Sequence, residues 1–155
     1  NTGNNYPGQI IDMDAEYFEK SWKSCCFGGF LFGREAVRRM VPSGKGTLLF
    51  TGASASLRGR ANFGAFNSAK AGLRTLAQAM AKEYGPQGIH VGHVIIDGAI
   101  AGEKIKRHLP ELAKKLGEDG MIKIEGIVDG YEYLYNQSPQ AWTFELDLRT
   151  SIEKW

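Results

Sequence analysis

The chain has 155 residues, 43% of them apolar and 23% charged, a composition that is typical of one globular domain and excludes a disordered or fibrous protein. Nineteen Lys and Arg residues against seventeen Asp and Glu residues leave a formal net charge of +2, too small for the basic field that nucleic-acid binding usually requires. The first residues lack the basic and apolar segments of a targeting signal, and no apolar run is long enough to span a membrane, so we expect neither nucleic acid nor a membrane as a partner.

The first part of the chain is predicted to be a loop followed by one long helix. Residues 1–13 are rich in Asn and Gly, and Asp14 is suited to cap a helix that continues to Pro42. The Gly residues inside this helix each cost about 1 kcal/mol of helix propensity relative to Ala. Core packing and a helix–helix interface would both account for them. The apolar positions that recur near the helical period are Phe18, Trp22, Cys25, Cys26, Phe30 and Val37.

The two cysteines, Cys25 and Cys26, are adjacent within this helix. Neighbouring residues do not readily reach the geometry of an ordinary structural disulfide. No His lies near them in the sequence to generate a thiolate, so we interpret both as packing residues rather than nucleophiles. Free thiols favour a reducing environment, and the sequence therefore predicts a soluble, cytoplasmic protein.

The middle of the chain alternates between strand and helix patterns. Residues 47–51 predict a short strand buried on both faces, followed by a loop of small residues, 52–56, at the sheet edge where parallel sheets bind ligands. A second long helix is predicted over 62–84, and a second buried strand over 89–96. This order, with its short connections, is typical of right-handed βαβ units and a parallel sheet.

The last third of the chain continues the same pattern. Residues 103–116 are predicted to be helical around Pro110, residues 122–135 form a further helix, and residues 142–148 alternate like a final strand. The sequence shows no internal repeat and no composition shift that would mark a second domain. We therefore expect one α/β domain over residues 1–155.

Two other groups of side chains are weighed as sites and set aside. His90 and His93 fall in the second strand, where residues three apart point to opposite faces, so we predict no metal site. Arg34, Arg38 and Arg39 are interpreted as a solvated helix face, because no row of aromatic residues accompanies them to stack nucleic-acid bases.

Four sequence features together carry a family resemblance. They are the turn Asn1-Thr2-Gly3, the helix positions Trp22 and Gly29, the segment Phe66-Asn67-Ser68-Ala69-Lys70-Ala71-Gly72-Leu73, and the strand ending at Gly98. Together they resemble the C-terminal part of the short-chain dehydrogenase/reductase family. The resemblance implies a Rossmann-like doubly wound parallel sheet and NAD or NADP as the cofactor. No Gly-x-x-x-Gly-x-Gly loop occurs here, so we expect an incomplete sheet whose N-terminal βαβαβ half is absent.

The resemblance also implies which residues form the catalytic site. The family uses a Tyr as general acid and base, a Lys four residues later, a Ser and an Asn. Lys70 occupies the Lys position, but the Tyr position holds Phe66, the Ser position holds Ala53 and the Asn position holds Cys25. Ser54 lies next to the altered Ser position. We therefore take Lys70 and Ser54 as the catalytic candidates.

The cofactor-binding residues come from the same resemblance. Asp97 and Gly98 stand where the family has Pro-Gly after its sixth strand, and Lys70 would hold the nicotinamide ribose. The implied cofactor-binding set is Asn1, Gly3, Lys70, Asp97 and Gly98.

Two functions follow from these features. The first is an NAD(P)-dependent oxidoreductase that is weak or inactive as this chain, with Ser54 or water as a substitute proton donor. The second is a non-catalytic binding or oligomerisation module derived from the same fold. In the family the corresponding helices build a four-helix dimer interface, and a partial sheet leaves an edge strand that needs covering. We therefore expect a homo-oligomer formed through the helices around 14–41 and 62–84.

Overall fold

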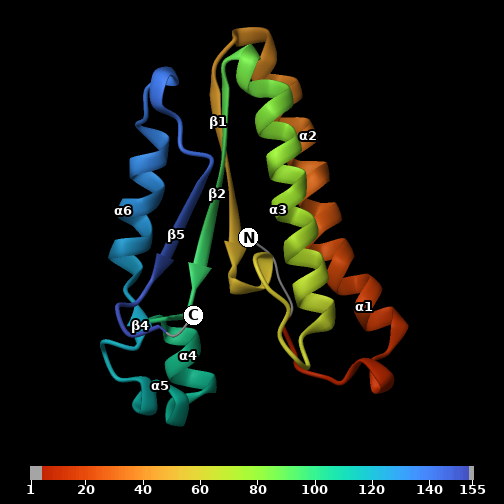
Figure 1. The fold of residues 1–155 in the computed structure, drawn as a ribbon, viewed down its shortest axis with the longest axis vertical. Helices are drawn as coiled ribbons and strands as arrows, with labels where there is room; N and C mark the ends of the chain where they lie inside the picture. Colours follow the sequence, from red (N-terminus) through yellow and green to blue (C-terminus); the bar gives the residue numbers. More distant parts are fainter. Residues whose placement is uncertain (1–4, 154–155) are drawn as a thin grey trace.

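A three-stranded parallel sheet forms the centre of the molecule (Figure 1). The computed structural model describes residues 5–153. Strands β1 (Gly46–Ala53), β2 (Ile89–Asp97) and β5 (Glu145–Arg149) lie in the order β1-β2-β5, with Gly46 opposite Ile89 and His93 opposite Glu145. The α/β class with a parallel sheet is confirmed.

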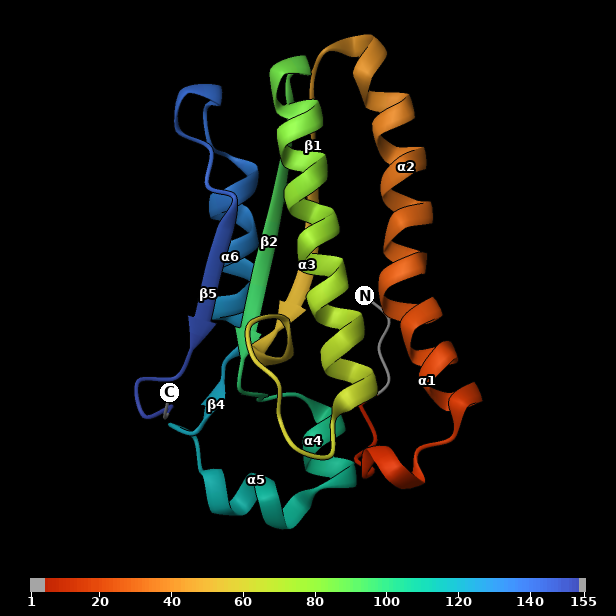
Figure 2. The same ribbon diagram turned by 45° about the vertical axis from the view of Figure 1, so that its right-hand side comes forward.

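Helices cover both faces of this sheet. The helices α1 (Ala15–Trp22), α2 (Gly28–Met40) and α3 (Gly64–Tyr84) lie on one face, and α6 (Ile124–Tyr135) lies on the other (Figures 1 and 2). The short helices α4 (Glu103–His108) and α5 (Pro110–Leu116) lie beyond the carboxyl ends of the strands. A pair of two-residue parallel strands, β3 (Ala99–Ile100) and β4 (Met121–Ile122), connects this part to the rest and was not predicted from the sequence.

The long first helix is interrupted rather than continuous. Asp14 caps it as expected, accepting hydrogen bonds from the backbone of Glu16 and Tyr17 at 3.3 Å each. Between α1 and α2, residues Lys23–Phe27 form a π-helical turn. A π turn adds a residue to the helical repeat. It thereby allows the adjacent Cys25 and Cys26 both to be buried, with exposed fractions of 3% and 8%.

Two apolar clusters hold the layers together. The cluster between α2, α3 and the sheet contains Val37, Leu48, Phe50, Leu73, Ala77, Met80, Ile89 and Val91. A smaller cluster under α6 contains Val94, Ile96, Ile122 and Leu134. Gly29 lies where a Cβ atom would stand 2.4 Å from Leu73 Cδ1, so the structure uses this Gly for close packing of the first helix on α3.

The strand β1 differs from its prediction. It is longer than expected, and only one of its faces is buried, because alternate residues such as Leu48 and Phe50 are buried while Leu49 is half-buried. Within residues 5–153 it pairs only with β2, so it is an edge strand, whereas every residue of the central β2 is buried.

No helix within residues 5–153 is long and apolar enough to cross a bilayer.

Candidate functional site

A cavity of about 910 Å³ lies at the carboxyl ends of β1 and β2. The ends of β1 and β2 supply one wall, the first turns of α3 supply another, and the loop between β1 and α3 and the start of α4 complete it. Figure 2 shows where these elements lie in the fold. This volume suits a small-molecule ligand, and the position is the edge at which parallel sheets bind ligands. The ligand-binding edge expected from residues 52–56 is thus part of a larger cavity.

Lys70 and Phe66 enter this cavity together from α3. Their spacing of four residues places them on one face of the helix. Lys70 Nζ lies 5.9 Å from the centroid of the Phe66 ring and donates a hydrogen bond of 2.9 Å to the carbonyl oxygen of Thr51. The Lys70 side chain is only 4% exposed, and this burial lowers the pKa of its ammonium group. A desolvated cation of this kind interacts strongly with an oxygen atom that carries negative charge.

The structure divides the other catalytic candidates between the cavity and the core. Ala53 ends β1, and Ser54 begins the short turn Ser54–Ser56; both line the cavity. Ser56 helps to fix this turn by accepting a hydrogen bond of 3.2 Å from the backbone N–H of Ala53. Cys25 does not line the cavity and is buried in the π turn. Burial raises the pKa of the neighbouring Cys26 thiol, which agrees with a packing role.

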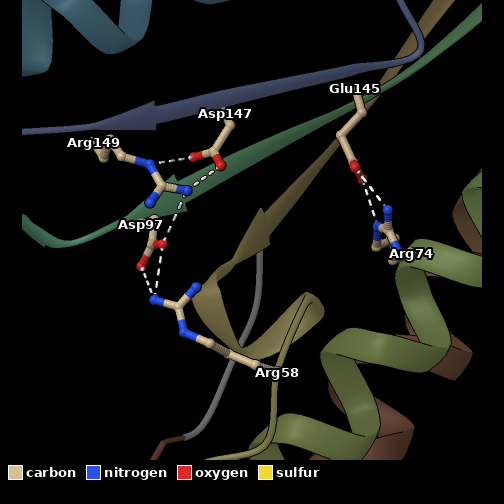
Figure 3. Close-up of polar contacts among 6 residues, drawn as sticks. All are labelled: Arg58, Arg74, Asp97, Glu145, Asp147 and Arg149. Atoms are coloured by element: carbon tan, nitrogen blue, oxygen red, sulfur yellow. Dashed lines mark hydrogen bonds and ion pairs between the residues drawn. The ribbon is translucent and has the colours of Figure 1, made fainter. Parts of the chain in front are cut away.

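Asp97 lies at the end of β2 and carries two ion pairs (Figure 3). Its carboxylate is 3.0 Å from Arg58 Nη2 and 3.3 Å from Arg149 Nη2, and Arg149 also binds Asp147. Burial of this carboxylate, which is 2% exposed, is compensated by the two guanidinium groups. Gly98 follows in the cavity wall. Asn1 and Gly3 lie outside the described residues.

A second polar cluster lies between α3 and the sheet, and sequence reasoning missed it. Arg74 donates two hydrogen bonds to Glu145, at 2.6 and 2.8 Å (Figure 3), and His93 Nδ1 lies 3.0 Å from Glu145 Oε2. The hydrogen bond from Arg74 lowers the pKa of Glu145, whereas burial lowers the pKa of His93. The sequence feature that could have pointed to this cluster is the position of Arg74, one helical turn beyond Lys70 on α3.

The two histidines of β2 have separate surroundings. His90 stacks on Trp142, with ring centroids 5.0 Å apart, and its Nε2 lies 2.9 Å from the carbonyl oxygen of Thr143. His93 lies instead against Gly52 and Glu145. No three His, Cys, Asp or Glu side chains within the described chain come together in a way that could hold a metal ion.

Comparison with known proteins places the chain in a family. A family model described as enoyl-(acyl carrier protein) reductase matches residues 1–126. The (21S)-21-acetoxyl-apo-melianone synthase SDR of Melia azedarach is 30% identical over 135 residues, which are 82% of this chain and 49% of that protein. The crystal structure of a short-chain dehydrogenase from Rhodopseudomonas palustris is 38% identical, with a TM-score of 0.76 over 96% of this chain and 59% of that one. The chain belongs to the short-chain dehydrogenase/reductase family.

The comparisons also show how much of the family fold is present. The chain spans about half the length of the curated relatives that it matches. The structure of ElxO with NADP bound has the same fold, with a TM-score of 0.82 at 16% identity over 62% of that chain. The chain is therefore partial relative to its homologues, and it corresponds to their C-terminal portion.

Proposed function

We propose that this chain forms the C-terminal half of the active site of an NAD(P)-dependent oxidoreductase whose general acid has been lost. The observation that carries the proposal is the presence of Lys70 and Phe66 in one cavity at the strand ends. A phenyl ring has no proton to donate. General acid–base catalysis contributes about two to four orders of magnitude in rate, so carbonyl reduction at this site is weak or absent.

The residues present fit one part of the cofactor. The buried ammonium group of Lys70 can donate to the hydroxyl groups of a nicotinamide ribose, and the cavity has room for such a group. The pyrophosphate needs a Gly-rich loop between a strand and a helix, which this sequence does not contain. When bound, the nicotinamide supplies or accepts a hydride. Lys70, Asp97 and Gly98 remain our candidates for contacts to it.

The remaining polar groups suggest what the site can still do. As a carbonyl oxygen gains negative charge, the Lys70 ammonium group would stabilise it electrostatically. The proton would then come from the hydroxyl group of Ser54, which lines the same cavity, or from water. Neither group combines the acidity and the position of a phenol held above Lys70, which is why we expect slow turnover.

Restoring the missing phenol tests this proposal. Reduced nicotinamide mononucleotide is the hydride donor of choice, because it carries the part of the cofactor that this chain fits and lacks the adenosine end. With a panel of aldehydes and ketones, Phe66→Tyr should raise the rate of its oxidation by about 10²- to 10⁴-fold.

Phe63→Tyr is the matched control, because Phe63 also lines the cavity but lies one helical turn before Phe66. It should leave the rate unchanged. If reduced nicotinamide mononucleotide binds to the chain and Phe66→Tyr brings no gain, the assignment of Phe66 is wrong. If the mononucleotide does not bind at all, the proposal that this chain carries out cofactor-dependent chemistry is wrong.

A row of exposed aromatic side chains favours a second function, assembly with another copy of the chain. Trp22 stacks on Phe27 with ring centroids 6.2 Å apart, and Phe27 stacks on Phe30 at 5.9 Å. These three rings are each more than a third exposed along the π turn and its flanking helices. Exposed apolar patches of this kind mark interaction surfaces. The helices around 14–41 and 62–84 therefore remain our proposed interface of a homo-oligomer.

Sedimentation of two matched variants tests this interface. Phe27→Glu places a charge in the aromatic row and should convert a dimer to monomers at micromolar concentration. Tyr135→Glu places the same charge on an exposed aromatic residue of α6 and should leave the dimer intact. A wild-type chain that sediments as a monomer at this concentration contradicts the proposal.

A further inference from the structure

The cavity is lined by more positive than negative charge. Its cationic side chains are those of Arg58, Arg60, Lys70 and Lys104, and its acidic side chains are those of Asp97 and Glu153. Asp97 is already compensated by Arg58 and by Arg149, which lies outside the lining. The lining therefore carries a net positive charge that would face a ligand in the cavity.

Two of these cations are held without a carboxylate. Arg60 stacks its guanidinium group over Phe63, with Cζ 5.2 Å from the ring centroid. Neither Arg60 nor Lys104 forms an ion pair with any residue between 5 and 153. The neighbouring Lys106 differs, because it pairs with Glu103 at 3.7 Å on the same short helix.

Arg58 also keeps part of its hydrogen-bonding capacity. Both of its bonds to Asp97 come from one nitrogen, Nη2, at 3.0 and 3.3 Å. In the described part of the chain its Nε and Nη1 atoms make no hydrogen bond. A guanidinium group presents five N–H donors in a planar fork that suits carboxylate and phosphate oxygens. The buried Asp97 thus anchors Arg58 while leaving donors for a ligand.

The side chain of Asn67 holds the loop that carries both arginines at two points. Asn67 Nδ2 donates to the carbonyl oxygen of Arg58 at 2.7 Å, and the backbone N–H of Arg60 donates to Asn67 Oδ1 at 3.2 Å. Asn67 lies between Phe66 and Lys70 on α3, so the helical turn that presents the reactive end of the cavity also positions the basic loop. This arrangement resembles a prepared binding site more than a set of solvated side chains.

We infer that the cavity takes a carbonyl compound bearing a carboxylate or phosphate group, and that Arg58, Arg60 and Lys104 bind this anionic group. The inference rests on the proposed function in that the bound compound would be the substrate of the Lys70 site. Its anion preference can be measured without any hydride transfer.

Binding of charge-matched pairs tests the inference. The first pair is 4-oxopentanoate and its methyl ester, and the second is dihydroxyacetone phosphate and dihydroxyacetone. Titrations followed by ligand-observed NMR at low ionic strength, without nucleotide, should show each anion binding at least about tenfold more tightly than its neutral partner, since tenfold corresponds to about 1.4 kcal/mol. A preference confined to one pair identifies the anion as carboxylate or phosphate.

Variants locate the effect. Arg60→Gln and Lys104→Gln should each reduce the preference, and their combination should reduce it further, to what Arg58 alone provides, while Lys106→Gln should retain it. Thermal unfolding of each variant checks that the fold is intact. Equal binding of acid and ester, failure of all four compounds to bind, or a preference that the double substitution leaves unchanged would each overturn the inference. These outcomes are independent of the Phe66→Tyr experiment, which reports on proton transfer alone.

Discussion

Lys70 and Arg74 are cations one turn apart on α3, yet they have opposite electrostatic surroundings. Arg74 meets the carboxylate of Glu145 through two hydrogen bonds, and these raise its pKa. Lys70 donates to a neutral backbone carbonyl and is more deeply buried, so burial lowers its pKa. Arg74 connects α3 to β5, whereas Lys70 faces the cavity.

From this difference we expect Arg74 to stabilise the fold and Lys70 to serve the proposed function. A half-buried ion pair with good geometry contributes to stability, and its loss leaves the other charge uncompensated. A lysine whose charged form is disfavoured in the folded state costs stability, and such costs are typical of binding and catalytic sites. Substitutions at Arg74, His93 and Lys70 test this division, and their expected effects on the free energy of unfolding decrease in that order.

The largest effect is expected for Arg74→Met. Removing the guanidinium group leaves Glu145 beside His93 with no cation, and we expect a loss of roughly 2 kcal/mol in the free energy of unfolding. Arg38→Met is the matched control, because Arg38 pairs with Glu35 at 3.2 Å on the exposed surface of α2. Its loss should be much smaller, because solvent screens an exposed pair. Urea denaturation measures both, and equal losses would contradict a special role for Arg74.

A smaller, pH-dependent effect is expected at His93. Burial lowers the pKa of this histidine, so the folded state favours the neutral ring. Below about pH 6.5 the unfolded chain takes up the proton more readily than the folded one. The free energy of unfolding should therefore fall between about pH 7 and pH 5. His93→Gln should flatten this dependence in urea titrations, and an unchanged slope would show that another group titrates there.

The smallest effect on stability is expected for Lys70→Met. Methionine removes the desolvated charge and keeps much of the side-chain volume, so the free energy of unfolding should change by less than about 1 kcal/mol. Binding of reduced nicotinamide mononucleotide should nevertheless be lost in a calorimetric titration. If Lys70→Met instead destabilises the chain as much as Arg74→Met and binding persists, the two cations are both structural.

The order of the main elements could be predicted from local patterns. The apolar run at the centre of β2, the Asp14 cap and the stop signal after α3 each depend on nearby residues, so periodicity and capping rules apply. The π turn at Lys23–Phe27 has no such local signal, because the burial of Cys25 and Cys26 that accompanies it depends on tertiary packing. The edge position of β1 likewise depends on tertiary pairing rather than on its own sequence.

The candidate site was only partly predictable. Lys70 and Phe66 were chosen because a motif with fixed spacing marks them, and Ser54 because it lies next to the Ser position of that motif; the structure brings all three to the cavity. Arg58 lies between Ser54 and Phe66, but its role depends on Asp97, 39 residues away, and the role of Glu145 depends on Arg74, 71 residues away. Spacing rules describe one helix or strand at a time, so they cannot predict ion pairs between different elements.

The pairing of β1 with one neighbour has a consequence for its amide protons. In a parallel ladder, successive residues of a strand direct their N–H groups alternately to either side. Amides of Gly46–Ala53 that face β2 should exchange slowly with solvent deuterium, and the intervening ones should exchange quickly, whereas residues 93–96 of β2, which pair on both sides, should be protected throughout. Any segment that hydrogen bonds to the outer edge of β1 would then be detected as the disappearance of this alternation.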